Sequence, residues 1–234
     1  MERSVHKMIS TPGVWLRRAK DVFQREGLTT LLRRSFRFVR PWFFEYGKYY
    51  LYEHTLKERN EADFMPKIED FTFKIISTNK EADEMAAATG FDLRRRFVDA
   101  RNKLDKGAIA FCIFIKREIV HIGWVGMTEE AKESMSEPPY KVDFLNNEAC
   151  TGGTLTIPEY RGKGLMSYGY FKRFQFLREK GIVRSRNAVD KSNIASQRAH
   201  AKFGPKVHAE ARYLKLLWWK FWKETPLTQT GQRD

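Results

Sequence analysis

The fold is decided in residues 155–165, which read Leu155-Thr156-Ile157-Pro158-Glu159-Tyr160-Arg161-Gly162-Lys163-Gly164-Leu165. The stretch begins as an apolar, Thr-rich strand pattern. Pro158 then ends the strand, because proline cannot donate a hydrogen bond to a neighbouring strand. A basic turn with two spaced glycines follows, and a long helix pattern begins near Gly164.

The glycine turn has the composition of an anion site. Gly162 and Gly164 permit positive φ and a close approach of the backbone to a ligand. The helix that follows directs its unpaired N–H groups and the positive end of its dipole toward the turn. With Arg161 and Lys163 beside them, these groups predict binding of a phosphate or pyrophosphate. The spacing is that of neither a G-x-G-x-x-G dinucleotide site nor a Walker P-loop.

The composition bounds the class of protein. A chain of 234 residues, 42% hydrophobic and 31% charged, allows one ordinary domain with an appendage or two small domains. The two cysteines, Cys112 and Cys150, lie in apolar strand-like runs and cannot form a disulfide framework. A reducing, cytoplasmic location is therefore expected. The chain begins without a signal-peptide pattern and contains no apolar run of about 18 residues, so no membrane-spanning segment is expected.

Positive charge is concentrated near the beginning of the chain. Residues 1–50 carry eleven Lys or Arg and four Asp or Glu, a net +7 of the +14 of the whole chain. Residues 14–26 and 28–39 repeat apolar positions at helical spacing against arginines and lysines, and an aromatic cluster follows Pro41. One interpretation is a basic helix pair on an anionic membrane surface through residues 14–50, peripheral on the inner face. The equal alternative is a helical hairpin against the main domain or a second protomer in a homodimer. Nucleic acid is a weaker third option, since no binding motif accompanies the charge.

The rest of the chain reads as an α/β domain after a polar linker over residues 53–70. The expected order is β-α-α-β-β-β-α-β-α-β, with room for a second C-terminal strand. The predicted strands cover residues 71–77, 108–116, 118–127, 144–157, 182–189 and 206–222, and the predicted helices cover 80–89, 93–104, 165–180 and about 192–203. The predicted division is an extension with linker over residues 1–65, a domain over 66–224 and a flexible tail over 225–234.

This order, with a basic glycine turn between the fourth strand and the third helix, resembles the GNAT superfamily of acyl-CoA-dependent N-acetyltransferases. The family's pyrophosphate signature, Gln/Arg-x-x-Gly-x-Gly/Ala, is matched by Arg161–Met166 except at its last position, which is Met166. A second family block, Asn-x-x-Ala/Ser-x-x-x-Tyr-x-x-x-Gly-Phe, is matched at Asn193, Ser196 and Gly204. His200 replaces its Tyr and Pro205 its Phe. The resemblance covers residues 71–222.

The resemblance implies a mixed, mostly antiparallel central sheet flanked by helices, in which the fourth and fifth strands splay apart. The pantetheine arm of acetyl-CoA or another acyl-CoA would lie in that gap, paired with the fourth strand. The backbone amides of the glycine turn would hold the pyrophosphate. The residues that it assigns to donor binding are Leu155, Thr156, Ile157, Arg161, Gly162, Lys163, Gly164, Leu165, Met166, Asn193 and Ser196.

The resemblance also suggests catalytic candidates for transfer of an acyl group to an amine. Glu148, a carboxylate near the fourth strand, is the candidate base, although a surface position at the strand entry explains it equally well. His200, in place of the family's Tyr, is the candidate acid, because imidazole titrates near neutral pH. A partly buried helix position is its alternative. His121 on the third strand is a candidate substrate contact, with a structural role favoured.

For the remaining candidate residues, a role in packing is favoured over a role in catalysis or ligand binding. Cys150 has no basic sequence neighbour that would lower its pKa, so core packing is favoured over an acyl-carrying role. No metal is expected, since the sequence lacks metal-ligand spacing. Trp218, Trp219 and Trp222 could hold an acyl chain, but packing of the last strand is favoured. The expected function is acyl transfer to a small-molecule or peptide amine, and the alternative is a non-catalytic acyl-CoA-binding or membrane- or partner-docking module.

Overall fold

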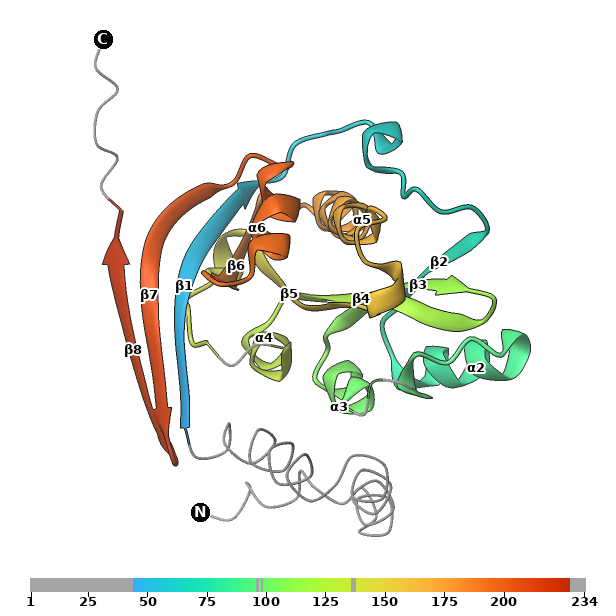
Figure 1. Ribbon diagram of the computed structural model, residues 1–234. Coiled ribbons are helices and arrows are strands. Elements are labelled where there is room, and N and C mark those ends of the chain that lie inside the picture. The colour runs from blue at the N-terminus through green and yellow to red at the C-terminus, as the bar shows by residue number, and fades with distance from the viewer. Residues whose placement is uncertain (1–43, 96, 98, 136–137, 228–234) are drawn as a thin grey trace, which may run out of the picture. The chain divides into compact units, whose positions relative to one another are not determined.

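The computed structural model describes residues 44–95, 97, 99–135 and 138–227 (Figure 1). The chain divides into two compact units. One holds residues 1–46 with Leu214–Phe221, and the other holds Gly47–Tyr213 with Trp222–Asp234. All described helices belong to the second unit. The amphipathic helices expected over residues 14–26 and 28–39 lie outside the described residues.

The described strands form one sheet of eight in the order β2-β3-β4-β5-β6-β1-β7-β8. The pairs β2–β3, β3–β4, β4–β5 and β1–β6 are antiparallel, whereas β5 and β6 run parallel. The expectation of a mixed, mostly antiparallel sheet is confirmed. The strands are β1 (Phe44–Thr55), β2 (Phe71–Ile76), β3 (Ile109–Ile115), β4 (Glu118–Gly126), β5 (Glu148–Thr156), β6 (Arg184–Asp190), β7 (Lys206–Leu216) and β8 (Trp219–Pro226).

Helices cover both faces of this sheet. α2, α3 and α4 pack on one face, and α5 and α6 on the other (Figure 1). The α-helices are α2 (Asn79–Thr89), α3 (Ala100–Asp105), α4 (Glu129–Met135), α5 (Leu165–Glu179) and α6 (Ile194–Ala201). The short 3₁₀ helices are η1 (Glu61–Phe64), η2 (Leu93–Arg95), η3 (Phe144–Asn146) and η4 (Pro158–Tyr160).

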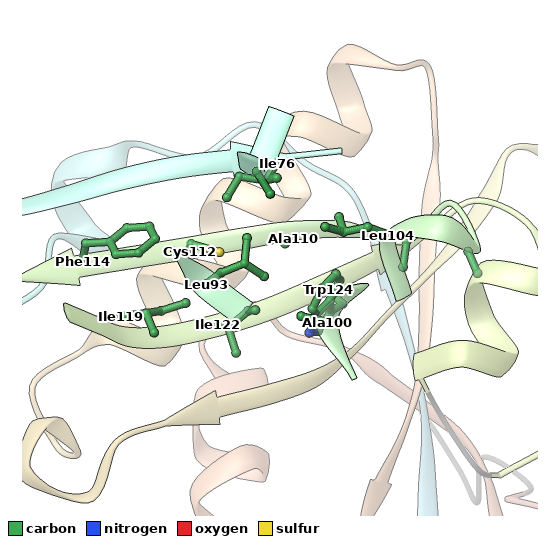
Figure 2. Close-up of a cluster of buried hydrophobic side chains, with 13 residues drawn as sticks. Ile76, Leu93, Ala100, Leu104, Ala110, Cys112, Phe114, Ile119, Ile122 and Trp124 are labelled. Atoms are coloured by element: carbon green, nitrogen blue, oxygen red, sulfur yellow. The ribbon is translucent and has the colours of Figure 1, made fainter. Parts of the chain in front are cut away.

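The core beneath α2, α3 and α4 is built on alternate residues of β3 and β4. Ala110, Cys112 and Phe114 of β3 meet Ile122 and Trp124 of β4 in one buried cluster (Figure 2). The intervening residues of β3 face the other layer, where they join clusters that contain residues of α5. Because both faces are covered, the two strands read as almost continuous apolar runs. Each large buried side chain contributes about 1.5–3 kcal/mol to folding.

The described structure corrects the expected linker. Residues 53–55 continue β1, in which Leu51, Tyr52 and His54 are buried. The expectation that a polar linker begins at residue 53 is therefore wrong. The strand was missed because its aromatic residues follow the basic amphipathic pattern directly, and tyrosine at consecutive positions hides the period of two.

Three other elements differ in extent from the prediction. The strand expected over 144–157 begins only at Glu148, after η3. The expected helix over 93–104 is divided into η2 and α3. Leu93, Phe97, Ala100 and Leu104 all pack against the same cluster, so their helical spacing conceals the break. The expected strand over 206–222 is a hairpin of β7 and β8, because Leu217 adopts φ 55° and reverses the chain.

Candidate functional site

β5 and β6 pair over three residues and then part. Glu148, Ala149 and Cys150 pair with Arg184, Ser185 and Arg186. Beyond this point β6 continues beside β1, while β5 continues beside β4 as far as Thr156. The edge of β5 that faces β6 therefore has no strand partner from Thr151 onward among the described strands. Such an edge can accept an extended ligand as an added strand.

A bulge shapes the open part of β5. Ile122 and Trp124 of β4 pair with Leu155 and Gly152, so two residues of β5 lie opposite one residue of β4. Gly153 lies within this bulge at φ +55°, and a Cβ there would come within 2.9 Å of the Trp124 ring. A bulge of this kind bends a strand and strengthens its twist. Here it coincides with the divergence of β5 from β6.

The glycine turn joins η4 to the start of α5. Gly162 has φ +75° and Gly164, the N-cap residue of α5, has φ +86°. Arg161, Gly162 and Lys163 are exposed. The first N–H groups of α5 have no partner within the helix, and the helix dipole adds positive potential beside two cationic side chains. The turn is thus an exposed, positively polarised cradle of backbone amides.

Met166, the residue that departs from the expected signature, does not obstruct this cradle. Its side chain packs against the apolar cluster that contains Phe171 and Phe174. Leu165 is likewise buried. Only the backbones of these two residues remain for the turn, so a longer side chain at position 166 is compatible with an amide cradle.

The three strand residues assigned to donor binding have different surroundings. Leu155 is 45% exposed on the open part of β5. Thr156 has its hydroxyl 2.8 Å from Nδ1 of His121, and its carbonyl accepts a hydrogen bond from Arg161 Nε at 3.2 Å. Ile157 is buried and donates its N–H to the carbonyl of Val120.

The second block of the resemblance forms the start of α6. Asn193, and not Ser192 or Asp190, is the N-cap residue, and its side-chain oxygen accepts from the N–H of Ser196 at 3.0 Å. Ser196 is buried. Asn193 thus caps α6 through the backbone N–H of Ser196, and the assignment of both residues to donor binding stays a prediction.

A chain of buried polar side chains begins where β5 and β6 part. Asn187 of β6 donates to the Thr151 hydroxyl at 3.4 Å, and its Nδ2 lies 3.1 Å from Nε2 of His200. Nδ1 of His200 lies 2.8 Å from Nε2 of His54. The Asn187 side-chain oxygen has no hydrogen-bond partner in the described structure. At the point where β5 and β6 part, the side-chain oxygen of Asn187 can therefore accept a further hydrogen bond.

His200 is a neutral interior imidazole. It is fully buried, stacks on Tyr52 and lies 4.3 Å from the Tyr170 ring, measured between ring centroids. Burial, together with the nearby His54 and Arg173, holds the pKa of His200 well below its usual range. Burial and the charges of Arg59 and Arg173 lower the pKa of His54 to about 3. A role for His200 as general acid stays a prediction, and these surroundings favour orientation of Asn187 instead.

Glu148 is the centre of an ion cluster. Its two oxygens accept hydrogen bonds from Arg186 at 2.6 and 3.0 Å and from the amide of Asp143 at 3.0 Å, and Arg184 forms an ion pair with it at 2.9 Å. Burial alone would raise the pKa of Glu148, but the hydrogen bonds from Arg186 and Asp143 and the charge of Arg184 hold it below its ordinary value. The candidate base is thus ionised but weakly basic, and its catalytic role stays a prediction.

A recess that opens to solvent lies beside this cluster. Arg186 lines it and also pairs with Glu53 at 2.9 Å. His208 Nε2 lies 3.5 Å from Arg186 Nη1, and burial together with the charge of Arg186 lowers the pKa of His208. The remaining lining comes from Leu51, Tyr52, Tyr140, Lys141, Asn187 and Glu224. Sequence analysis did not find His208, which carries no motif in its strand.

The structure also places the remaining candidates from the sequence: Cys150, His121 and the three tryptophans near the end of the chain. Cys150 is buried, its thiol donates to the carbonyl of Gly126, and burial raises its pKa to about 12. His121 is buried, and burial with the charge of Arg173 lowers its pKa to about 3. Trp222 packs against Tyr49 and Tyr213. Trp218 and Trp219 are 77% and 58% exposed, so the expectation that they fill the packing of the last strand is wrong.

Among residues 44–95, 97, 99–135 and 138–227, no group of three or more His, Cys, Asp or Glu side chains is arranged to hold a metal ion. No helix within the same residues is long and apolar enough to span a membrane.

Solved structures that resemble this one include several acetyltransferases. A GNAT-family acetyltransferase from Colwellia psychrerythraea is 16% identical over 73% of this chain and 55% of its own, with a TM-score of 0.46. The glucosamine N-acetyltransferase region of a fungal multi-domain β-N-acetylglucosaminidase is 15% identical over 81% of this chain and 23% of its own (TM-score 0.49). A GNAT-family protein from Novosphingobium aromaticivorans is 13% identical over 74% of this chain and 66% of its own (TM-score 0.43). The chain thus spans about half, or less, of the first two of these proteins.

The family of this chain is identified by comparison of its sequence with a family model. No curated protein matches the sequence significantly. The model of the acetyltransferase (GNAT) family matches residues 80–204, which include the open strand, the glycine turn and α6. Because this match covers more than half of the sequence, the chain belongs to the acetyltransferase (GNAT) family.

Proposed function

We propose that this protein transfers an acyl group from acyl-CoA, most simply acetyl-CoA, to an amine acceptor. The observation that carries the proposal is the divergence of β5 from β6 after Cys150, which leads directly into the glycine turn at the start of α5. An extended pantetheine arm would pair with the open edge of β5. Its pyrophosphate would then meet the turn, as the membership of the family implies.

The turn suits a pyrophosphate in both geometry and charge. Gly162 has no atom within 4 Å of the position that a Cβ would take, so the backbone is open to a ligand. The amides of the first turn of α5 and the side chains of Arg161 and Lys163 would supply donors and positive charge. Leu165 and Met166 would contribute backbone only, since their side chains pack inward.

Asn187 is the side chain best positioned to meet the acyl end of the donor. It follows the last paired residue of β6, and its partner Thr151 follows the last paired residue of β5. A long, weak bond of 3.4 Å between them can be exchanged for a bond to a ligand. Donation from the Asn187 amide to the thioester oxygen would stabilise the negative charge that develops during transfer.

The recess lined by Arg186 and His208 is the proposed acceptor site. An attacking amine must lose a proton, and a neutral imidazole can accept it. The lowered pKa of His208 keeps its ring neutral near pH 7, whereas Glu148 is held as a weakly basic carboxylate by two arginines. We therefore propose His208 as the proton acceptor, with Glu148 holding Arg186 in place. A small-molecule or peptide amine is the acceptor class.

A second function, non-catalytic acyl-CoA binding, is favoured by one specific observation. Both side chains first assigned to catalysis are occupied: Glu148 by Arg184 and Arg186, and His200 by His54 and Asn187. A module of this kind would bind the donor and release no free CoA. The donor site is common to both functions, so donor binding and turnover need separate tests.

Donor binding is tested by calorimetric titration with acetyl-CoA. The double variant Arg161→Ala/Lys163→Ala should bind about tenfold to a hundredfold more weakly, because two charge-assisted contacts to phosphate are lost. Lys180→Ala removes an exposed lysine at the other end of α5 and serves as the matched control. Wild-type protein that binds no acyl-CoA, or a double variant that binds as tightly as the control, would rule out this donor site.

Turnover is tested by release of free CoA in the presence of a panel of amines. His208→Gln should lower kcat with donor affinity unchanged, and Asn187→Leu should lower kcat more than it weakens donor binding. Glu148→Gln tests the first candidate base in the same assay. Donor binding without CoA release for any amine would favour the non-catalytic module.

A further inference from the structure

The turn between β7 and β8 carries an exposed apolar surface. Five large apolar side chains occur within six residues: Leu216, Leu217, Trp218, Trp219 and Phe221 are 44%, 42%, 77%, 58% and 54% exposed. We refer to residues 216–221 as the Trp tip. Leu217, at φ 55°, reverses the chain and puts two leucines and two tryptophans at the end of a hairpin. The Trp218 and Trp219 rings lie edge to face, 6.3 Å apart.

The next tryptophan along β8 is held differently. Trp222 packs against Tyr49 and Tyr213, and its indole N–H donates to Glu224 at 2.7 Å. Exposure is therefore a property of the Trp tip and not of every aromatic residue in β8. Leu145, by comparison, is 95% exposed as a single side chain followed by two asparagines. Contiguous apolar exposure of this kind marks an interaction surface.

The charged residues in the sequence of this hairpin end are all positive. Residues 211–223 contain no Asp or Glu and four cations, with Lys215 and Lys220 directly flanking the apolar run. Lysine is depleted from protein–protein interfaces, whereas tryptophan with lysine is typical of segments at the boundary of an anionic bilayer. Exposed tryptophans next to lysines thus fit a partner that has an apolar interior and a negatively charged surface.

We propose that the Trp tip docks into the headgroup region of a bilayer that contains anionic lipid. The two indoles and two leucines would enter the boundary between headgroups and acyl chains, while Lys215 and Lys220 would contact lipid phosphates. Stable attachment usually requires two signals, and the net +7 of residues 1–50 supplies a second one in the same chain. The inference is independent of acyl transfer, since none of these residues belongs to the donor or acceptor site.

The test is flotation of the full-length protein with vesicles of phosphatidylglycerol and phosphatidylcholine in equal parts, at physiological salt. Trp218→Ala/Trp219→Ala should weaken partitioning about tenfold or more, because most of the apolar area of two indoles no longer leaves water. Lys215→Gln/Lys220→Gln should weaken it about thirtyfold, at roughly fivefold for each lysine. Leu145→Ala is the control for loss of an exposed apolar side chain, and Lys106→Gln/Lys180→Gln is the control for loss of two exposed lysines.

The outcomes distinguish binding of the Trp tip to anionic lipid from formation of a dimer through the Trp tip. Partitioning that both tip variants lose and both controls retain supports the proposal, as does quenching of indole fluorescence by brominated lipid that Trp218→Ala/Trp219→Ala abolishes. The proposal is overturned if the wild type does not float, if it floats equally with phosphatidylcholine alone, or if the Trp218→Ala/Trp219→Ala variant floats equally well. It is also overturned if these tryptophans hold together a dimer in lipid-free sedimentation and that dimer ignores vesicles.

Discussion

The proposed donor side and the proposed acceptor side of the site are built from different kinds of groups. The donor side consists of backbone: an open strand edge over Thr151–Thr156 and a turn in which Gly162 and Gly164 take positive φ. The acceptor side consists of side chains from four strands, in which Glu148 and Glu53 enclose Arg186 and His208 lies beside it. The donor side should therefore depend on backbone conformation, and the acceptor side on charge balance.

Breaking the charge balance should produce the largest effect. Glu148 is buried, and Glu148→Gln removes its charge from Arg186, which is 23% exposed and keeps Glu53, and from Arg184, which is 42% exposed. We expect the free energy of unfolding to fall by about 3 kcal/mol, since removal of one member of a buried pair leaves charge uncompensated. Urea unfolding measures this loss, and acetyl-CoA affinity should not change.

The control for this substitution is Glu84→Gln, which breaks an ion pair with Lys80 in which both side chains are largely exposed. Such pairs contribute about 0.5 kcal/mol or less. Equal losses for the two variants would contradict the view that the ion cluster holds the acceptor side together.

The two buried histidines, His54 and His200, should make stability depend on pH. In the unfolded chain His54 and His200 bind a proton near pH 6.5, whereas in the folded protein the pKa of His54 is about 3 and that of His200 is well below its usual range. Their contribution is thus complete above pH 6.5 and is lost as the pH falls toward 3. We expect a decline of about 1 kcal/mol per pH unit for each histidine below pH 6.

Urea unfolding between pH 7 and pH 5 measures this slope. The variant His54→Leu/His200→Leu should show a flatter profile, even if its stability at pH 7 is lower. An unchanged slope would mean that the two rings are protonated in the folded protein, and the assignment of His200 as a neutral positioning residue would then be wrong.

A matched pair of glycines, Gly162 and Gly181, tests whether the backbone of the glycine turn binds the donor. Gly162 and Gly181 have φ of 75° and 76°, and neither has an atom within 4 Å of an added Cβ. Alanine at either position should cost about 1–2 kcal/mol of stability through backbone strain alone. Only Gly162→Ala should also weaken acetyl-CoA binding, by about tenfold, because only this glycine lies in the turn. Equal affinities for the two variants would show that the backbone of the turn does not bind the donor.

The sequence predicted the local structure of the glycine turn well because its signals are local. Pro158, Gly162 and Gly164 each restrict the backbone within their own stretch, and the helix that follows is long and periodic. The order of the central strands was also predicted, since β3 and β4 are apolar runs joined by a tight turn. In that turn Lys116 and Arg117 take positive φ.

The rest depends on tertiary contacts that no local pattern reveals. His54 and His200 are 146 positions apart, so their contact and their neutral state follow from the packing of β1 against α6. The occupation of Glu148 by Arg184 and Arg186 depends on the parallel register of β5 and β6. For Trp218 and Trp219, β propensity predicted a strand, but the hairpin turn at Leu217 decided that their side chains are exposed.

Hydrogen–deuterium exchange of the full-length protein with and without acetyl-CoA tests the central claim most directly. If the donor binds along the open strand and the glycine turn, peptides that cover Thr151–Thr156 and Gly162–Met166 should exchange more slowly with acetyl-CoA. Peptides from β2, at the edge of the sheet remote from β6, should not change. Binding of acetyl-CoA with no protection of residues 151–166, or with protection confined to other strands, would contradict the account.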